Sequence, residues 1–151
     1  MGNGVLGTNI VASIGILVKD IDAMKKKYAA FLGLPEPEAF WTGDIKDTRA
    51  EYLGRPCPAK ARLAFFDIGP NLQLELIQPD DQPSLWRDNL ERHGEGFHEI
   101  SFRIKGTNEK IAALAKNGMP VIQRGEYPGG RYAYIDSLKD LKILIETLEN
   151  D

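Results

Sequence analysis

A pattern of one strand, one helix and then further strands occurs twice along this chain. Apolar β-branched residues occupy every second position of segment 13–18, and apolar residues do the same in segment 99–104. Such period-two alternation predicts a strand with one buried face. An amphipathic stretch follows each segment and predicts a helix, and each half ends in two apolar stretches that predict a hairpin. The sequence therefore predicts two tandem copies of one β-α-β-β-β module.

The two copies imply a particular fold class. We expect the first module over about residues 10–80 and the second over about 97–149, with a short helix at about 83–93 between them. Residues 1–151 then form a single α+β domain, whose curved mixed sheet surrounds a cleft that both modules share.

Residue types also predict where elements begin. Asp20 and Thr107 are expected to cap the two module helices, because short polar side chains accept hydrogen bonds from free N–H groups at helix starts. The linker helix is expected to begin with Pro83. In the second hairpin, strand 131–136 is expected to lead into a strand over 141–148.

Composition narrows the class of protein. The net charge of −3 argues against a nucleic-acid partner, because phosphate binding requires clustered basic residues. A single cysteine, Cys57, allows no internal disulfide and fits a reducing cytoplasm. We expect no membrane association, since no stretch approaches the ~20 apolar residues that a membrane span needs. The N-terminus lacks the pattern of a signal peptide.

Four segments carry a resemblance to a known family: SIGILVKD (13–20), LELIQP (74–79), GEGFHEISF (94–102) and ILIETLE (143–149). On these segments the chain resembles the vicinal oxygen chelate superfamily of glyoxalases, dioxygenases and bleomycin-resistance proteins. It is most similar to the methylmalonyl-CoA epimerases and related glyoxalase-like lyases. The resemblance implies a homodimer that takes a small-molecule ligand.

The resemblance also implies a set of cation ligands. It places the four ligand positions of the metal-dependent members at Ser13, Glu75, Glu99 and Glu146. The family pattern has histidine at the first and third positions, where this sequence has serine and glutamate. Ser13 is a weak ligand, so it would rather orient water or substrate.

Strand alternation supports the same grouping independently. Ser13 and Glu99 lie on the strand faces opposite the apolar residues, and Glu146 alternates with Ile145 and Thr147. Three adjacent carboxylates need a bound cation, a nearby base such as Arg103, or a proton. Oxygen ligands favour hard ions such as Mg²⁺, Mn²⁺ or Ca²⁺ over zinc, with Co²⁺ as a further candidate.

Two functions fit these residues. In the first, the protein is an enzyme in which Glu75 or Glu146, or Glu51 from the long loop, transfers a proton alpha to a carbonyl or thioester. An epimerase, isomerase or lyase fits this chemistry. In the second, it is a metal-free binding protein of the bleomycin-resistance type with an aromatic pocket. The candidate substrate-binding residues are Ser13, Arg103, Trp41, Phe66, Tyr132 and Tyr134.

His98 directly precedes Glu99, and two interpretations stay open. Ideal alternation puts it on the face opposite Glu99, as a histidine at a strand edge. A β-bulge would reverse this and bring it toward the carboxylates.

Overall fold

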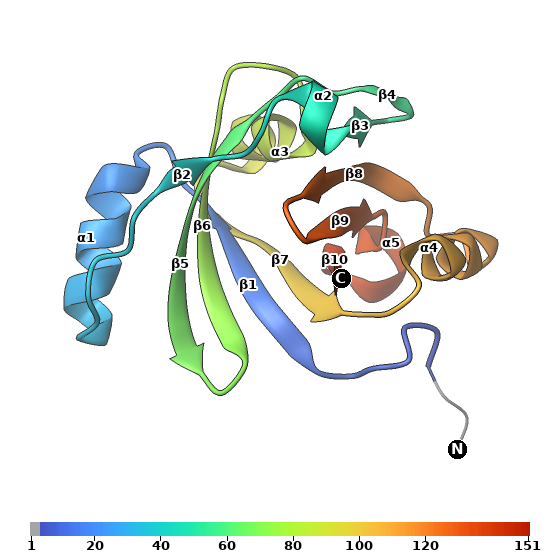
Figure 1. Cartoon of the computed structure of the whole chain (residues 1–151), viewed down its shortest axis with the longest axis horizontal. Coiled ribbons are helices and arrows are strands. Elements are labelled where there is room, and N and C mark those ends of the chain that lie inside the picture. The colour runs from blue at the N-terminus through green and yellow to red at the C-terminus, as the bar shows by residue number, and fades with distance from the viewer. Residues whose placement is uncertain (1–3) are drawn as a thin grey trace.

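One mixed sheet of ten strands organises the computed structural model, which describes residues 4–151 (Figure 1). Its strand order is β2-β5-β6-β1-β7-β10-β9-β8-β3-β4. The strands are β1 (Val11–Leu17), β2 (Phe40–Trp41), β3 (Glu51–Tyr52), β4 (Arg55–Pro56), β5 (Ala61–Gly69), β6 (Leu72–Pro79), β7 (Gly96–Arg103), β8 (Val121–Tyr127), β9 (Gly130–Ile135) and β10 (Ile145–Asn150). The helices are α1 (Ile21–Leu32), α2 (Ile45–Thr48), α3 (Leu85–His93), α4 (Thr107–Lys116) and α5 (Leu138–Leu141). Within residues 4–151, no helix combines the length and apolar character that crossing a membrane requires.

The two halves of the sheet have the same topology. In the first half the order is β1-β6-β5-β2, and in the second it is β7-β10-β9-β8. The first strand of each half runs parallel to the last, and β1 pairs antiparallel with β7 where the halves meet. The predicted α+β fold with a curved mixed sheet is thereby confirmed (Figure 1).

Two helices cover one face of the sheet. Helix α1 packs on β5 and β6, and α4 packs on β9 and β10, so both lie outside the curve (Figure 1). We call the opposite, concave side the inner face. Helix α3 packs on that side, where its Trp86 joins Leu17, Ile77 and Tyr134 in a buried cluster. Truncating such a buried aromatic residue to alanine typically costs about 3–5 kcal/mol, so α3 anchors one end of the inner face firmly.

The long connection between α1 and β5 crosses from one half of the sheet to the other. Its strand β2 pairs with β5, whereas β3 pairs with β8 of the second half. Tyr52 of β3 donates a hydrogen bond to Asp88 of α3. Burial, followed by this hydrogen bond to Asp88, raises the pKa of Tyr52 to about 12, so the phenol stays neutral. The connection thus fastens α3 over the inner face.

Helix starts agree with the sequence at one of three expected positions. Asp20 caps α1 and accepts a hydrogen bond from the N–H of Ala23 at 3.1 Å, as predicted. Helix α3 starts after Ser84 rather than at Pro83, because the Ser84 hydroxyl accepts the hydrogen bond that caps it. The prediction for Thr107 is wrong, since it is the first residue of α4 and the cap position is a glycine.

The connection between the two strands of the second hairpin is longer than predicted. Strand β10 begins at Ile145 rather than at residue 141, because helix α5 occupies the connection. The buried Ser137 hydroxyl donates to the carbonyl of Ile143 at 2.8 Å and accepts from the N–H of Ile145 at 2.9 Å. This serine holds the loop and sets where β10 starts.

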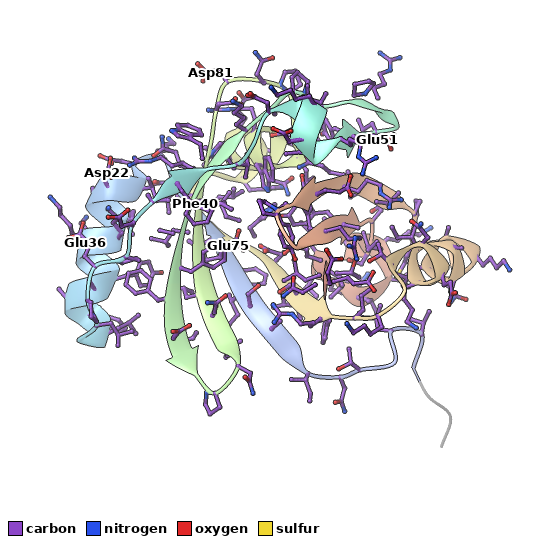
Figure 2. The ribbon with its side chains drawn as sticks, viewed as in Figure 1. Asp22, Glu36, Phe40, Glu51, Glu75 and Asp81 are labelled. Atoms are coloured by element: carbon purple, nitrogen blue, oxygen red, sulfur yellow. The ribbon has the colours of Figure 1, made fainter. Side chains whose placement is uncertain are left out.

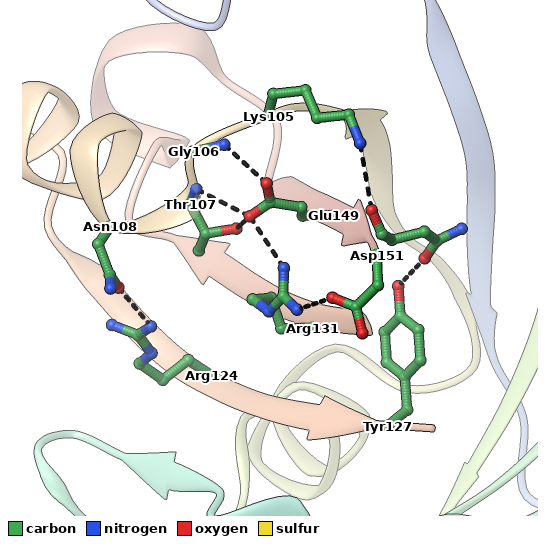
Figure 3. Close-up of polar contacts among 10 residues, drawn as sticks. Lys105, Gly106, Thr107, Asn108, Arg124, Tyr127, Arg131, Glu149 and Asp151 are labelled. Carbon is green, nitrogen blue, oxygen red and sulfur yellow. Dashed lines mark hydrogen bonds and ion pairs between the residues drawn. The ribbon is translucent and has the colours of Figure 1, made fainter. Parts of the chain in front are cut away.

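Glu149 of β10 takes over the capping role at α4 (Figure 3). Its carboxylate accepts hydrogen bonds from the backbone N–H of Gly106 at 2.8 Å and of Thr107 at 3.0 Å, and from the Thr107 hydroxyl at 2.7 Å. Arg131 adds an ion pair at 3.1 Å. The Thr107 hydroxyl and these backbone groups lower the pKa of Glu149 to about 2. A carboxylate from the last strand therefore ties α4 to the sheet.

We expect Glu149→Gln to lower the melting temperature at pH 7, because the amide loses charge and acceptor capacity at the helix start. The carboxylate's pKa falls on folding, from an ordinary 4.5 to about 2, so its contribution is present above pH 4.5. The difference between the variant and the wild type should shrink as the pH falls from 4.5 toward 2. Thermal unfolding across this range measures it, with the exposed Glu38→Gln as control. Equal melting temperatures at pH 7 would contradict the assignment.

Candidate functional site

Three glutamates from three strands meet on the inner face. Glu75 comes from β6 (Figure 2), Glu99 from β7 and Glu146 from β10. One carboxylate oxygen of each lies within 4.8 Å of the others. The residues are 8 %, 0 % and 4 % exposed, respectively. We call these three residues the carboxylate cluster.

Strand pairing explains why the three side chains converge. Gly15 of β1 is the cross-strand partner of both Glu75 and Glu99. Ser101, two residues after Glu99, is the partner of Glu146. Residues that pair directly across strands share a face of the sheet, so the register alone brings the cluster together.

Gly15 is essential to this arrangement, although the sequence did not single it out. A Cβ atom at this position would overlap the Glu99 carboxylate, whose oxygen Oε2 lies directly over the glycine. The available signal was a glycine in the middle of a strand, which often marks a close approach. The glycine creates the space that the buried carboxylate fills.

Two buried serines lie beside the cluster. The hydroxyls of Ser13 and Ser101 are hydrogen-bonded to each other, and both residues are buried. Ser13, a predicted site residue, thus faces inward from β1. Ser101 was not singled out from the sequence, although it shares the face of Glu99. The pair adds hydroxyl oxygens to a site built from carboxylate oxygens.

In the part of the chain that the structure describes, ion pairs do not balance the charge of the cluster. Within residues 4–151, no lysine, arginine or histidine forms an ion pair with any of its members. Both carboxylate oxygens of Glu99 and Oε2 of Glu146 are buried without a hydrogen-bond partner. A cation or protons must therefore balance the charge.

The pKa values follow from this environment. Burial raises the pKa of Glu99 to about 7. Burial also raises the pKa of Glu75 and of Glu146 well above the ordinary range, and the charge of Glu99 adds to both shifts. Near neutral pH the cluster consequently retains protons unless a cation replaces them.

His98 lies on the inner side of β7 because the strand carries a bulge. Gly15 pairs with Glu99 and Ile16 pairs with Phe97, which leaves His98 without a partner. Its ring is buried against Tyr134, with centroids 5.2 Å apart. Burial lowers the pKa of His98 to about 3, so the imidazole is neutral. The bulge thus turns His98 toward the inner face. The prediction from ideal alternation, which put His98 on the face opposite Glu99, is wrong.

The two predicted tyrosines also lie on the inner side, but their hydroxyls are engaged. Tyr134 accepts a hydrogen bond from the Trp86 indole at 2.9 Å, and Tyr132 accepts one from Gln123 at 3.1 Å. Tyr134 is the cross-strand partner of Glu146, which places this residue next to the cluster. Both tyrosines connect the second half of the sheet to α3.

Phe66 and Trp41 do not face the cluster. Phe66 packs on Tyr28 of α1, with ring centroids 6.2 Å apart, in the core on the outer face. Trp41 borders a separate cavity of about 730 Å³ beside Lys19 and Arg87. The expectation that these two aromatic residues line a shared pocket is wrong, because the register turns each of them away from the inner face.

Glu51 does not join the cluster either. It pairs with Arg124 of β8, whereas its neighbour Tyr52 points toward α3. Figure 2 shows Glu51 at β3, well apart from Glu75. Arg103, by contrast, continues the inner-face row of Glu99 and Ser101 on β7 and is exposed.

A family model for the Glyoxalase/Bleomycin resistance protein/Dioxygenase superfamily matches residues 13–134. The chain belongs to this superfamily. It is 31% identical over 144 residues to the uncharacterized protein YqjC of Bacillus subtilis (strain 168), a match that covers 93% of this chain and 92% of the relative.

Solved structures with the same fold include methylmalonyl-CoA epimerases. The enzyme from Mycobacterium tuberculosis aligns with a TM-score of 0.68 and 18% identity, covering 100% of this chain and 93% of that one. A variant epimerase from Streptomyces coelicolor in complex with 2-nitronate-propionyl-CoA aligns with a TM-score of 0.63 and 19% identity, covering 93% and 96%. At these identities the likeness establishes the fold.

We expect Gly15→Ala to disrupt the carboxylate cluster, because the new methyl group would occupy the space of the Glu99 carboxylate. The side chain would have to leave a fully buried position, so the melting temperature should fall by several degrees. Gly43→Ala is the matched control, since a Cβ atom there meets only ordinary contacts. If both variants melt like the wild type, Glu99 does not depend on the glycine.

Proposed function

We propose that this protein is an enzyme that transfers a proton at a carbon alpha to a carbonyl or thioester, with the help of a divalent cation. The observation that supports the proposal most strongly is the carboxylate cluster, with three buried acids and no basic partner among residues 4–151. Such an arrangement is unfavourable unless a function maintains it.

The residues present suit a hard cation. Glu75, Glu99 and Glu146 would hold it, and unpartnered buried oxygens of Glu99 and Glu146 are available as ligands. The Ser13 and Ser101 hydroxyls add further oxygens nearby. Oxygen donors favour Mg²⁺, Mn²⁺ or Ca²⁺, with Co²⁺ less suited. When bound, such a cation acts as a Lewis acid that stabilises negative charge on the substrate carbonyl oxygen.

The carboxylates themselves would move the proton. Glu75 and Glu146 are the candidate bases, because each brings a buried carboxylate to the site, and in its ionised form such a carboxylate can accept a proton from carbon. Glu75 is the most exposed of the three, at 8 %, and so the most accessible to a substrate. The structural neighbours include an epimerase in complex with methylmalonyl-CoA, which supports a thioester as one candidate substrate.

The alternative is a metal-free binding protein of the bleomycin-resistance type, which the absence of the family's two histidines favours. A homodimer and a cytoplasmic location stay predictions from the resemblance and the sequence.

Cation binding separates the two functions. We expect the wild type to bind Mn²⁺ and Mg²⁺, and we expect Glu146→Gln to weaken binding by at least about tenfold, because it removes one of three anionic ligands. Isothermal titration calorimetry of the chelator-treated protein measures both, with Glu38→Gln as a charge-matched control. A wild type that binds neither ion would favour the metal-free binding protein.

Proton exchange tests the reaction itself. In D₂O with Mg²⁺, we expect the wild type to exchange the C2 proton of methylmalonyl-CoA or the C3 proton of a 2-oxo acid, which lies alpha to its ketone; NMR follows the exchange. Glu75→Gln and Glu146→Gln should each slow exchange by at least about 100-fold, the usual range for loss of a general base. Glu38→Gln should retain the wild-type rate. Absence of exchange on both substrate types, in protein that binds the cation, would count against the proposal.

A further inference from the structure

A cavity of about 400 Å³ lies on the outer face of the second half of the sheet. The residues that line it are mainly apolar and include Leu6, Phe102, Leu114, Met119, Ile135 and Ile145. Phe102 follows Ser101 on β7, and Ile145 precedes Glu146 on β10, so both side chains point away from the inner face. The cavity is therefore on the opposite side of the sheet from the carboxylate cluster.

The few polar residues in the lining are engaged or lie in solvent. The Ser137 hydroxyl donates a hydrogen bond to the carbonyl of Ile143 at 2.8 Å. The Thr8 hydroxyl accepts one from the N–H of Ile10 at 3.2 Å, and Asn9 is exposed. A buried water needs about two to four polar partners, whereas an apolar cavity stays dry and takes apolar molecules. The lining is thus suited to a hydrocarbon chain.

The segment before β1 forms one wall of the cavity and leaves it open to solvent. The N–H of Gly7 donates to the carbonyl of Gly4 at 3.1 Å, and this turn carries Leu6 onto the buried cluster under α4 (Figure 1). Two other lining residues, Val5 and Leu141, are 38% and 51% exposed. Ligand pockets range from about 300 to 1,000 Å³, so this opening leads to a space for a small ligand.

Lysines outnumber acids on the helices that border the cavity. Helices α4 and α5, with the residue that ends α5, contain four lysines and two acids, and within residues 4–151 none of the six forms an ion pair. Lys110 lies against the N-terminal wall: a Cβ atom on Gly7 would meet its ammonium at 3.8 Å, and Gly7 stands between the lining residues Leu6 and Thr8. The surroundings of this apolar cavity are therefore positive on balance and favour an anionic head group.

We propose that this cavity binds an unbranched carboxylic acid of about six to eight carbons, whose alkyl tail fills the cavity and whose carboxylate pairs with Lys110. Each CH₂ group that leaves water strengthens binding about fourfold. The carboxylate gains a charge-assisted contact with the ammonium. Because the cavity and the carboxylate cluster lie on opposite faces of the sheet, this site is independent of the proposed function.

The tail and the head group are tested by isothermal titration calorimetry with hexanoate, heptanoate, octanoate and octanol, at low salt and with chelator present. The affinity for the acids should rise about fourfold with each added CH₂ group. Lys110→Gln should weaken octanoate by at least about threefold and leave octanol unchanged, because only the acid uses the ammonium. Lys27→Gln, at an exposed position of α1, is the matched control and should behave as wild type.

Two further variants test the cavity itself. Thr8→Trp fills it from the N-terminal wall, so octanoate and octanol should both bind at least about tenfold more weakly, whereas Thr8→Ser should bind as wild type. Met119→Gln places an amide of similar size in the apolar lining and should also weaken both ligands. Met24→Gln makes the same change on α1, in the core of the first half, and should leave binding unchanged.

Equal affinity of the wild type for hexanoate and octanoate would overturn the inference, because the tail would then gain nothing from the cavity. Octanoate that binds Lys110→Gln as tightly as the wild type, or that binds Thr8→Trp and Met119→Gln undiminished, would overturn it too. A last contrary result concerns a second copy of this chain as the occupant. If octanoate does not bind and Leu141→Lys lowers the mass found by sedimentation velocity, that copy covers the cavity and the inference is wrong.

Discussion

Mutual repulsion of three buried carboxylates is the constraint on which the site depends. Two like charges 4.8 Å apart repel each other by at least about 3 kcal/mol at an effective dielectric constant of about 20. Three such pairs amount to about 10 kcal/mol, which is comparable to the whole stability of an ordinary domain. Glu75, Glu99 and Glu146 therefore cannot all be ionised in the folded chain unless a cation or protons compensate them.

The rest of the fold holds this unfavourable group together. Gly15 has no side chain, so the Glu99 carboxylate can lie over β1. Ser137 fixes the start of β10 and hence the position of Glu146, one residue after Ile145. Helix α3, held by Tyr52 and by the Trp86–Tyr134 hydrogen bond, closes one end of the inner face. Each of these contacts limits the freedom of the carboxylates to separate and become hydrated.

Much of this could be predicted from the sequence, because alternation and repetition are local signals. Strand alternation alone predicted that Ser13 and Glu99 face the cleft, and the repeat matched the position of Glu75 with that of Glu146. The register of a strand is set by its partner strands and is not a local property, so the sequence could not distinguish Phe66 from its neighbour. The error at Phe66 is a shift of one residue, which in a strand exchanges the two faces.

Other features required contacts between distant segments. The bulge that turns His98 inward depends on how β7 pairs with β1, so the alternation within β7 alone does not predict it. Similarly, the cap of α4 comes from Glu149, at the far end of the chain, instead of from the adjacent Thr107. A carboxylate that replaces a local hydroxyl at a helix start is visible only once β10 lies beside α4.

The exchange of two family histidines for Ser13 and Glu99 gives the site its own electrostatic character. With histidine at both positions, the site would have two neutral imidazoles and two carboxylates. This chain instead has three carboxylates and a hydroxyl pair. The additional negative charge would strengthen attraction for a hard divalent cation, and it raises the proton affinity of the carboxylates. Protons would compete with a bound cation for the same oxygens, so on the proposed function the occupancy of the site would fall as the pH falls. A site of this composition would bind its cation most readily when the carboxylates can ionise, which is also the state in which they can accept a substrate proton.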